Sequence, residues 1–195
     1  MKPLISTKAE WRKKLLARRQ NMSSSDQKRA ANEAAHILQE TAFFKRAQHI
    51  ACYYPIQHEF DCLPLIELIW RAQKKCYLPV LSDDSLDFFL YEKNTTLQPN
   101  RYQIPEPVTD KKIALDQLDI VLLPLVGFDE TGNRLGMGAG YYDRTFHQNT
   151  ALKKPFLLGL GYEVQQVSEL PKAVWDVPLD GVLTEKNMRT FRDAI

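Results

Sequence analysis

A continuous apolar run from Asp119 to Val126 constrains the fold of this chain more than any other feature. A strand with one face toward water alternates apolar and polar residues, and this run does not, which is typical of a strand buried on both faces. The same lack of alternation is seen in Phe156–Leu160 and Gly181–Thr184. Strands of this kind occur in parallel sheets, whose crossover helices cover both faces, so the run predicts an α/β fold.

Helix signals precede these strands. Thr7 and Glu10 form a T-x-x-E capping box, which predicts a helix that continues to about Gln20. A second start signal at Ser24–Gln27 precedes apolar residues with helical spacing, which are Ala30, Ala34, Ile37, Leu38 and Thr41. This second helix is expected to pack on a core.

Strand and helix patterns alternate through the middle of the chain. Short apolar runs predict strands at Ile50–Tyr54, Cys76–Leu81 and Leu86–Tyr91, and helical spacing predicts a helix at Leu63–Lys75. The proline-containing segment Asn94–Asp116 is expected to be a long ordered loop. The pattern predicts a three-layer fold, a mostly parallel sheet flanked by helices, and residues 1–195 are expected to form a single domain.

Composition excludes several classes of protein. With 44% hydrophobic and 26% charged residues, the 195-residue chain is neither disordered nor a coiled coil. Its longest apolar run, Ile120–Phe128, is interrupted by Pro124 and is shorter than the roughly 20 residues of a membrane span. No apolar segment follows Met1, so a cytoplasmic location is expected. The formal net charge of +2 indicates neither a nucleic acid nor a membrane as partner.

Cysteine and histidine give no metal-binding pattern. The three cysteines, Cys52, Cys62 and Cys76, lack a C-x-x-C spacing and are expected to be reduced thiols in or near the core. The four histidines lack the i, i+4 spacing of a helical metal site; they are His36, His49, His58 and His147.

A glycine-rich segment follows the central strand. Four of the eight glycines, Gly132, Gly136, Gly138 and Gly140, lie between this strand and a helix predicted to begin near Tyr141. Glycines at such a site can adopt positive φ and let the backbone approach an oligophosphate. Arg134 adds a cation suited to phosphate oxygens. The alternative is a plain structural turn, which usually needs only one or two glycines.

The standard nucleotide motifs are absent from the sequence. Tyr141 stands where G-x-G-x-x-G needs its third glycine, and no G-x-x-x-x-G-K-[ST] can be written. The expected topology is therefore Rossmann-like without a dinucleotide fingerprint.

Several longer stretches of the sequence are similar to those of a known protein family. Pro124–Asp129 and Gly132–Arg144 closely resemble the signature of 5-formyltetrahydrofolate cyclo-ligase, also called 5,10-methenyltetrahydrofolate synthetase. The resemblance extends to Lys8 with Arg12, Tyr54–Glu59 with Asp61, Leu78–Val80, Ile104–Pro107 and Trp175–Asp180. It implies a ligase that uses ATP and Mg²⁺ to convert 5-formyltetrahydrofolate to 5,10-methenyltetrahydrofolate, with release of ADP and phosphate. The implied route is phosphorylation of the formyl oxygen and ring closure by N10, without a protein nucleophile.

The resemblance also implies the ATP contacts and a catalytic role for Arg134. The implied ATP-binding residues are Lys8, Arg12, Arg134, Leu135, Gly136, Met137, Gly138, Ala139, Gly140, Tyr141 and Tyr142. Lys8 and Arg12 are four residues apart on one helix face and can point at the same anion. Without the resemblance, Arg12–Lys14 with Arg18 and Arg19 is typical of a solvated basic face. Ala139 departs from the family, since many relatives have lysine there.

Four further residues match functional positions of the family. Asp143 and Asp176 match positions associated with Mg²⁺, and their alternatives are a helix cap and a loop cap. Tyr54 and Glu59 match the folate contacts, and their alternatives are a packed tyrosine and a rim carboxylate. Tyr141 and Tyr142 could stack on a ring or fill the core.

Two other functions remain open at this point. One is a nucleotide-binding α/β protein that acts on a different small molecule, since folds of this kind host many chemistries. The other is a nucleic-acid module built on the Arg12–Arg19 helix, which the balanced charge disfavours. The expected partner is a reduced folate, with no nucleic acid, no membrane and no obligate protein partner.

Overall fold

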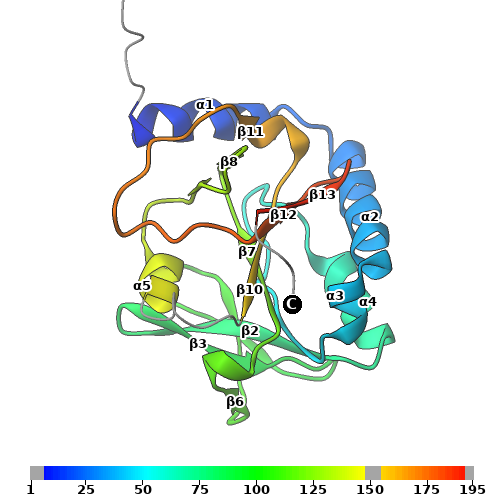
Figure 1. The fold of residues 1–195 in the computed structure, drawn as a ribbon. Helices are drawn as coiled ribbons and strands as arrows, with labels where there is room; N and C mark the ends of the chain where they lie inside the picture. Colours follow the sequence, from blue (N-terminus) through cyan, green and yellow to red (C-terminus); the bar gives the residue numbers. More distant parts are fainter. Residues whose placement is uncertain (1–6, 148–154, 192–195) are drawn as a thin grey trace, which may run out of the picture.

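An eight-stranded sheet forms the centre of the computed structural model, which describes residues 7–147 and 155–191 (Figure 1). Its strand order is β13-β12-β10-β7-β1-β2-β3-β6. The strands are β1 His49–Ala51, β2 Lys75–Ser82, β3 Ser85–Leu90, β6 Lys112–Ile113, β7 Ile120–Pro124, β10 Phe156–Leu160, β12 Gly181–Leu183 and β13 Met188–Thr190. Strands β12, β10, β7, β1 and β2 run parallel, so the sheet is mostly parallel as the sequence predicts. Strands β13, β3 and β6 pair antiparallel with their neighbours.

Helices cover both faces of this sheet (Figure 1). Three of them, α2 Ser24–Glu40, α3 Ala42–Arg46 and α4 Leu63–Arg71, pack on one face, against a cluster that includes Ile120 and Leu122. The short helix α5, Tyr141–His147, lies on the other face, where Phe146 packs with Val121 and Leu123. The alternate residues of β7 therefore enter two different cores, which confirms the strand buried on both faces and the three-layer fold.

The first helix, α1, begins where its capping box predicts. It spans Lys8–Gln20, with Thr7 and Glu10 exchanging both hydrogen bonds of the box. The second start signal was misplaced by one residue, because Ser23 is the N-cap of α2 and its side chain accepts from the Asp26 amide at 3.1 Å. The predicted third helix ends at Arg71 rather than Lys75, since Gln73 turns left-handed with φ of 58° and β2 follows.

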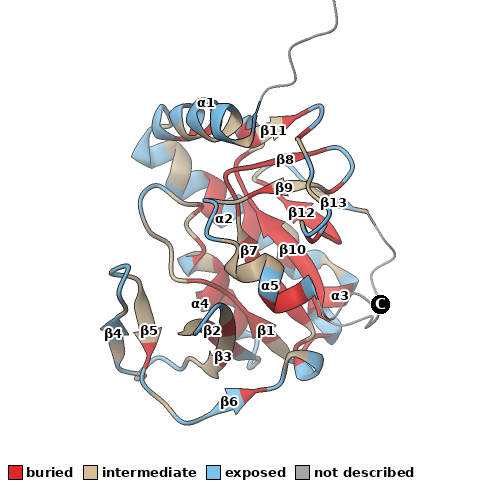
Figure 2. Cartoon of the chain, turned by 90° about the vertical axis from the view of Figure 1, so that its left-hand side faces the viewer, coloured by how far each residue is buried: buried red, intermediate tan, exposed pale blue. Residues whose placement is uncertain are grey.

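The segment predicted as a long loop contains secondary structure, so that prediction was wrong. Strands β4 (Leu97–Pro99) and β5 (Pro105–Pro107) form a hairpin, and η1 (Leu115–Gln117) precedes β7. Figure 2 shows the hairpin standing apart from the main sheet. Its support is a side chain, because Glu106 Oε1 accepts from the Leu81 amide at 2.9 Å and from Asn100 Nδ2 at 2.7 Å.

A second small sheet of three strands carries the segment after β7. It consists of β8 (Gly127–Asp129), β9 (Arg134–Leu135) and β11 (Gln166–Val167), and η2 (Glu163–Gln165) precedes β11. Leu15 of α1 packs on this sheet in a third apolar cluster. The same contact fixes α1 beside the segment that bears the glycines.

Cys52, Cys62 and Cys76 are free thiols and are all buried, as expected. Within residues 7–147 and 155–191, no helix has both the length and the apolar character that a membrane crossing requires.

Candidate active site

A cleft of about 960 Å³ opens at the carboxyl ends of β1, β2 and β7. Its floor includes Tyr53 and Tyr54, which follow β1, and Pro124–Val126 at the end of β7. From β1 the chain continues to β2 on one side, whereas β7 and β10 lie on the other. This is the point at which an open α/β sheet leaves a crevice for ligands.

All of the site residues expected from the sequence line this one cleft. They are Lys8, Arg12, Tyr54, Glu59, Asp143, Asp176 and the continuous segment Arg134–Tyr142. They come from α1, from the segment after β1, from β9 and α5, and from the loop before β12. The fold thus brings together residues that are up to 168 positions apart in the chain.

The glycine-rich segment divides into two turns with different roles. The first, between β8 and β9, contains Gly132 with φ of 86°, and a Cβ there would lie 2.8 Å from the Phe191 ring. Gly132 does not line the cleft, so the sequence grouped one structural glycine with three glycines of the cleft. The buried Asp129 holds this turn, because its carboxylate accepts from the amides of Thr131 and Asn133.

The second turn, Gly136–Gly140, faces the cleft. Gly138 and Gly140 have φ of 107° and 73°, which confirms positive φ at these two positions. Arg12 Nε donates to the Gly136 carbonyl at 2.8 Å, and a Cβ on Gly138 would lie 3.3 Å from the guanidinium carbon of Arg12. The missing side chain therefore lets the cation of α1 lie against the turn.

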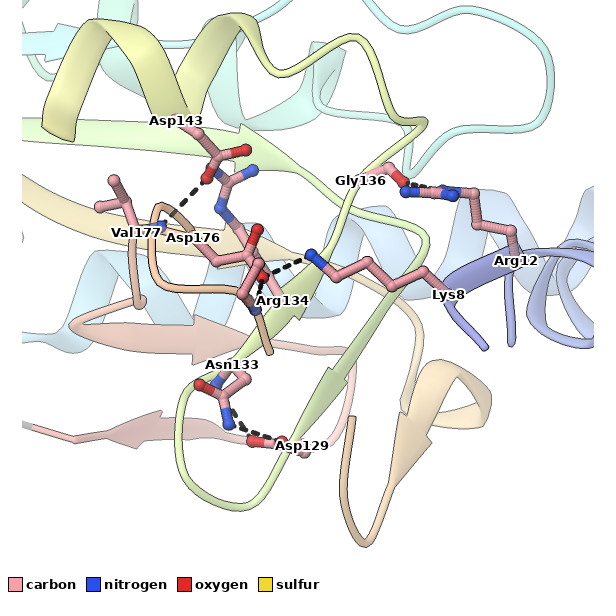
Figure 3. Close-up of polar contacts among 10 residues, drawn as sticks. Lys8, Arg12, Asp129, Asn133, Arg134, Gly136, Asp143, Asp176 and Val177 are labelled. Carbon is pink, nitrogen blue, oxygen red and sulfur yellow. Dashed lines mark hydrogen bonds and ion pairs between the residues drawn. The ribbon is translucent and has the colours of Figure 1, made fainter. Parts of the chain in front are cut away.

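Arg134 is a buried cation at the centre of the site (Figure 3). Its side chain is 5% exposed, and Nη2 donates to Asp143 Oδ1 at 2.6 Å. Burial lowers the pKa of the Arg134 guanidinium, and the negative charges of Asp143 and Asp176 oppose this shift. Among the described residues, no group accepts a hydrogen bond from its buried Nε. Arg134 therefore keeps an unused donor beside the cleft.

Two carboxylates stand on either side of Arg134. Asp143 Oδ1 accepts from Arg134 and, at 3.1 Å, from the Val177 amide, while Asp176 Oδ2 accepts from Lys8 and from the Ala173 amide (Figure 3). In the part of the chain that the structure describes, these hydrogen bonds occupy one oxygen of each carboxylate. The described residues contain no group of three or more side chains able to hold a metal. Mg²⁺ needs only one or two carboxylates when phosphate oxygens and waters complete its shell.

The opposite end of the cleft contains Glu59. Its Oε2 accepts from the Ile56 amide at 3.1 Å. Burial raises the pKa of the Glu59 carboxyl, and the Ile56 hydrogen bond and the charge of Arg19 oppose this shift. Burial also raises the pKa of the Tyr142 hydroxyl, and the nearby charge of Glu59 adds to the rise. Tyr54 is half-buried beside this group and packs against the larger core.

Sequence reasoning missed three residues around the cleft, of which Tyr102 lines it. Arg101 and Tyr102, in the tip of the β4–β5 hairpin, contact the Tyr141 hydroxyl through Arg101 Nη2 at 2.5 Å and the Tyr102 hydroxyl at 3.2 Å. No local pattern relates them to a helix some 40 residues further on. Arg19 was assigned to a solvated face and is only 3% exposed. A usable signal existed, because Arg19 lies seven residues from Arg12 and so on the same face of α1.

Comparison with known proteins identifies the family of this chain. A model described as the 5-formyltetrahydrofolate cyclo-ligase family matches residues 5–185. The chain belongs to this family. A 5-formyltetrahydrofolate cyclo-ligase of Escherichia coli strain K12 is 39% identical over 172 residues, covering 86% of this chain and 94% of the relative. One from Haemophilus influenzae is 38% identical and covers 85% of this chain and 90% of its own length.

Solved structures agree with this membership. The 5,10-methenyltetrahydrofolate synthetase of Aquifex aeolicus superposes with a TM-score of 0.83 at 32% sequence identity, covering 96% of this chain and 94% of the other. A synthetase of the same name from Mycoplasma pneumoniae superposes with a TM-score of 0.73 at 24% identity and supports the fold alone. The mostly parallel sheet flanked by helices is thus the architecture of the family.

Proposed function

We propose that this protein is an ATP- and Mg²⁺-dependent 5-formyltetrahydrofolate cyclo-ligase that forms 5,10-methenyltetrahydrofolate, ADP and phosphate. The observation that carries the proposal is the buried Arg134, whose Nη2 bonds to Asp143 and whose Nε is unused among the described residues, in a cleft lined by the glycine turn. A fixed cation with a spare donor is suited to the charge of a transferring phosphoryl group. Family membership supplies the folate substrate.

Lys8, Arg12 and the segment Arg134–Tyr142 hold the triphosphate in this proposal. Arg12 is already fixed against the turn by its bond to Gly136, so little side-chain entropy is lost on binding. The amides of Gly136–Gly140 can approach phosphate oxygens because glycine adds no side chain there. Ala139 contributes no cation, so Lys8, Arg12 and Arg134 supply the positive charge.

Asp143 and Asp176 would hold the Mg²⁺, each through the oxygen that Arg134 or Lys8 does not occupy. The ion would supply further neutralisation of phosphate charge. Lys8 and Arg134 already contact these carboxylates, so the cations and the metal ligands are ordered together before the substrates bind.

Tyr54 and Glu59 orient the folate. The formyl oxygen takes the γ-phosphoryl group of ATP, N10 then attacks the formyl carbon and loses its proton, and phosphate leaves with the former formyl oxygen. Glu59 offsets the positive charge that develops on the ring system. The buried Cys52 and Cys62 thiols take no part, since burial raises their pKa well above its ordinary value.

An absorbance time course tests the proposal. Purified protein is mixed with 5-formyltetrahydrofolate, ATP and Mg²⁺, and the near-ultraviolet band of the methenyl product is followed, with ATP and the metal omitted in turn. Growth of the band that requires both is the expected result. No growth from a protein that still binds nucleotide would overturn the proposal and favour the alternative, an α/β protein that acts on another small molecule.

A further inference from the structure

One face of α1 reaches both ends of the cleft. Lys8, Arg12, Leu15 and Arg19 are separated by four, three and four residues and so share that face. Arg12 and Arg19 are two turns apart, about 10 Å along the axis. Arg12 contacts the glycine turn through Gly136, whereas Arg19 Nη2 donates to the Gln57 carbonyl at 3.1 Å. Gln57 lines the cleft together with Glu59.

The burial of Arg19 calls for an explanation. It is 3% exposed, and burial lowers the pKa of its guanidinium. Throughout residues 7–147 and 155–191, nothing accepts a hydrogen bond from its Nε. A buried cation with an unsatisfied donor costs stability unless negative charge nearby compensates. Among the groups that oppose the lowering of the Arg19 pKa, Glu59 has the largest effect, followed by Tyr53 and Tyr162.

The turn that carries Glu59 depends on contacts from outside itself. Gln57 and His58 have φ of 44° and 61°, a left-handed conformation that is strained for non-glycine residues. Within the turn, the Glu59 amide donates to the Ile56 carbonyl at 2.8 Å, and Glu59 Oε2 accepts from the Ile56 amide at 3.1 Å. The bond from Arg19 to Gln57 ties the middle of this turn to α1.

The charged and titratable groups that face Glu59 come from several elements. Arg19 comes from α1, Tyr142 from α5, and Tyr53 and Cys62 from the segment between β1 and α4. The Tyr162 hydroxyl, after β10, donates to the Glu59 carbonyl at 3.4 Å. Arg19 is the cation of this set, and its charge favours the ionised carboxylate.

We propose that Arg19 is a positioning residue, which fixes the turn at residues 56–59 and holds the Glu59 carboxylate, in its ionised form, at the folate end of the cleft. The role assigned to Glu59 rests on the proposed function, whereas the coupling between Arg19 and Glu59 does not. Because Arg19 and Arg12 share one rigid helix, the same element sets the distance between the phosphate end and the folate end.

The coupling is tested by carbon-13 NMR titration of the Glu59 carboxyl, assigned with Glu59→Gln, in the wild-type protein and in Arg19→Met. The cation of Arg19 lowers the pKa of Glu59, so Glu59 is expected to titrate at a higher pH in Arg19→Met. Arg19→Lys retains the charge and is expected to titrate like the wild type. Arg18→Met is the matched control, since the exposed Arg18 also donates to backbone carbonyls, those of Val164 and Gln166. Glu59 is expected to titrate there as in the wild type.

Steady-state kinetics complete the test. In Arg19→Met, kcat/KM for 5-formyltetrahydrofolate is expected to fall by about tenfold or more, with nucleotide affinity within about twofold of wild type. An unchanged Glu59 titration, or an unchanged kcat/KM, would overturn the positioning role. If Arg19→Met does not fold, Arg19→Gln decides, because it removes the charge but retains an amide donor, and an unchanged Glu59 titration in that variant contradicts the proposal. A wild-type protein without turnover would reject the proposed function, while the titration would still decide the coupling.

Discussion

One short segment of the chain contains two glycine-bearing turns that differ in role, one structural and one facing the cleft. The turn Asp129–Asn133 is closed, since its amides and side chains bond to one another and to the Asp129 carboxylate. The turn Gly136–Gly140 is open, since its residues line the cleft and Arg12 donates to its Gly136 carbonyl from α1. A glycine with positive φ occurs in both turns and so does not separate them, whereas the hydrogen bonding of the nearest buried charge does.

The buried charges of the two turns differ in how fully they are satisfied. Burial alone would raise the pKa of Asp129, yet hydrogen bonds from Asn133, Leu170 and Thr131 lower it. Arg134 has one firm partner, Asp143, and an unused Nε. A saturated charge stabilises a fold, whereas an unsaturated charge is available to a ligand.

The largest expected effect is a loss of activity when the buried cation beside the open turn is removed. Arg134→Ala is expected to lower kcat/KM by about a thousandfold, because the developing phosphoryl charge loses its fixed cation. Circular dichroism is expected to show the wild-type fold. Arg144→Ala, which removes an exposed arginine from the rim of the same cleft, is the matched control and is expected to cost less than about tenfold. Near-normal activity of Arg134→Ala would remove Arg134 from the mechanism.

The second-largest expected effect is a loss of stability when the carboxylate of the closed turn is changed. Asp129→Asn is expected to lower the free energy of unfolding by about 3 kcal/mol, because an amide group must face donors that the carboxylate accepted, including the Leu170 amide. Urea unfolding measures the loss. Nucleotide affinity is expected to stay within about twofold of wild type, since the closed turn does not line the cleft. A large loss of nucleotide affinity in a stable Asp129→Asn protein would contradict the division between the turns.

The pH dependence of stability gives a second test of Asp129. Its folded pKa is lowered from 3.8, so the unfolded state takes up the proton first as pH falls. The contribution of Asp129 is therefore complete above about pH 4 and decreases as pH falls through the folded value. The free energy of unfolding of Asp129→Asn is expected to fall less in this acid range than that of the wild type. Equal acid dependence of the two proteins would mean that Asp129 is not the group responsible.

Paired glycine substitutions compare the turns at equal backbone strain. Gly132→Ala places a methyl group 2.8 Å from the Phe191 ring and 3.0 Å from the Leu179 carbonyl, and is expected to cost about 2 kcal/mol of stability with nucleotide affinity unchanged. Gly138→Ala places a methyl group 3.3 Å from the guanidinium carbon of Arg12 and is expected to weaken nucleotide binding by about tenfold with a smaller loss of stability. Thermal unfolding and calorimetric titration with ATP measure both quantities. The reverse assignment of the two losses would overturn the comparison.

The smallest expected effect adds a charge to the open turn. Ala139 is exposed beside the cleft, and its methyl group brings no cation there. Ala139→Lys is expected to lower KM for ATP by about two- to fivefold at low ionic strength, and less in high salt because exposed charges are screened. A salt-independent effect, or none, would show that this side chain does not approach the phosphates.

Local chemistry made much of this fold predictable. The capping box at Thr7 needs only a partner three residues away, and the doubly buried β7 is visible as an unbroken apolar run. The β4–β5 hairpin was not predictable, since its support comes from Glu106 and the distant Leu81 amide. Proline-rich sequence hides such an edge pairing because it removes backbone donors.

The candidate site was likewise predictable only in part. The family signature led to every proposed contact in the cleft, but it did not separate the structural Gly132 from the glycines that face the cleft. Arg19 was misjudged because an arginine pair at the end of a helix is typical of a solvated face. Its burial comes from tertiary contacts with the Gln57 turn, and the sequence signal for it is the seven-residue spacing from Arg12, which places both on one face of α1.

The central claim is that the open turn sets the γ-phosphoryl group of ATP against the formyl oxygen of the folate. Oxygen-18 in the formyl group tests it most directly. Turnover of labelled 5-formyltetrahydrofolate with ATP and Mg²⁺ is followed by mass analysis of the released phosphate. The account predicts one labelled oxygen in each phosphate formed, because the formyl oxygen leaves bound to phosphorus. Unlabelled phosphate, with the label in water, would contradict it.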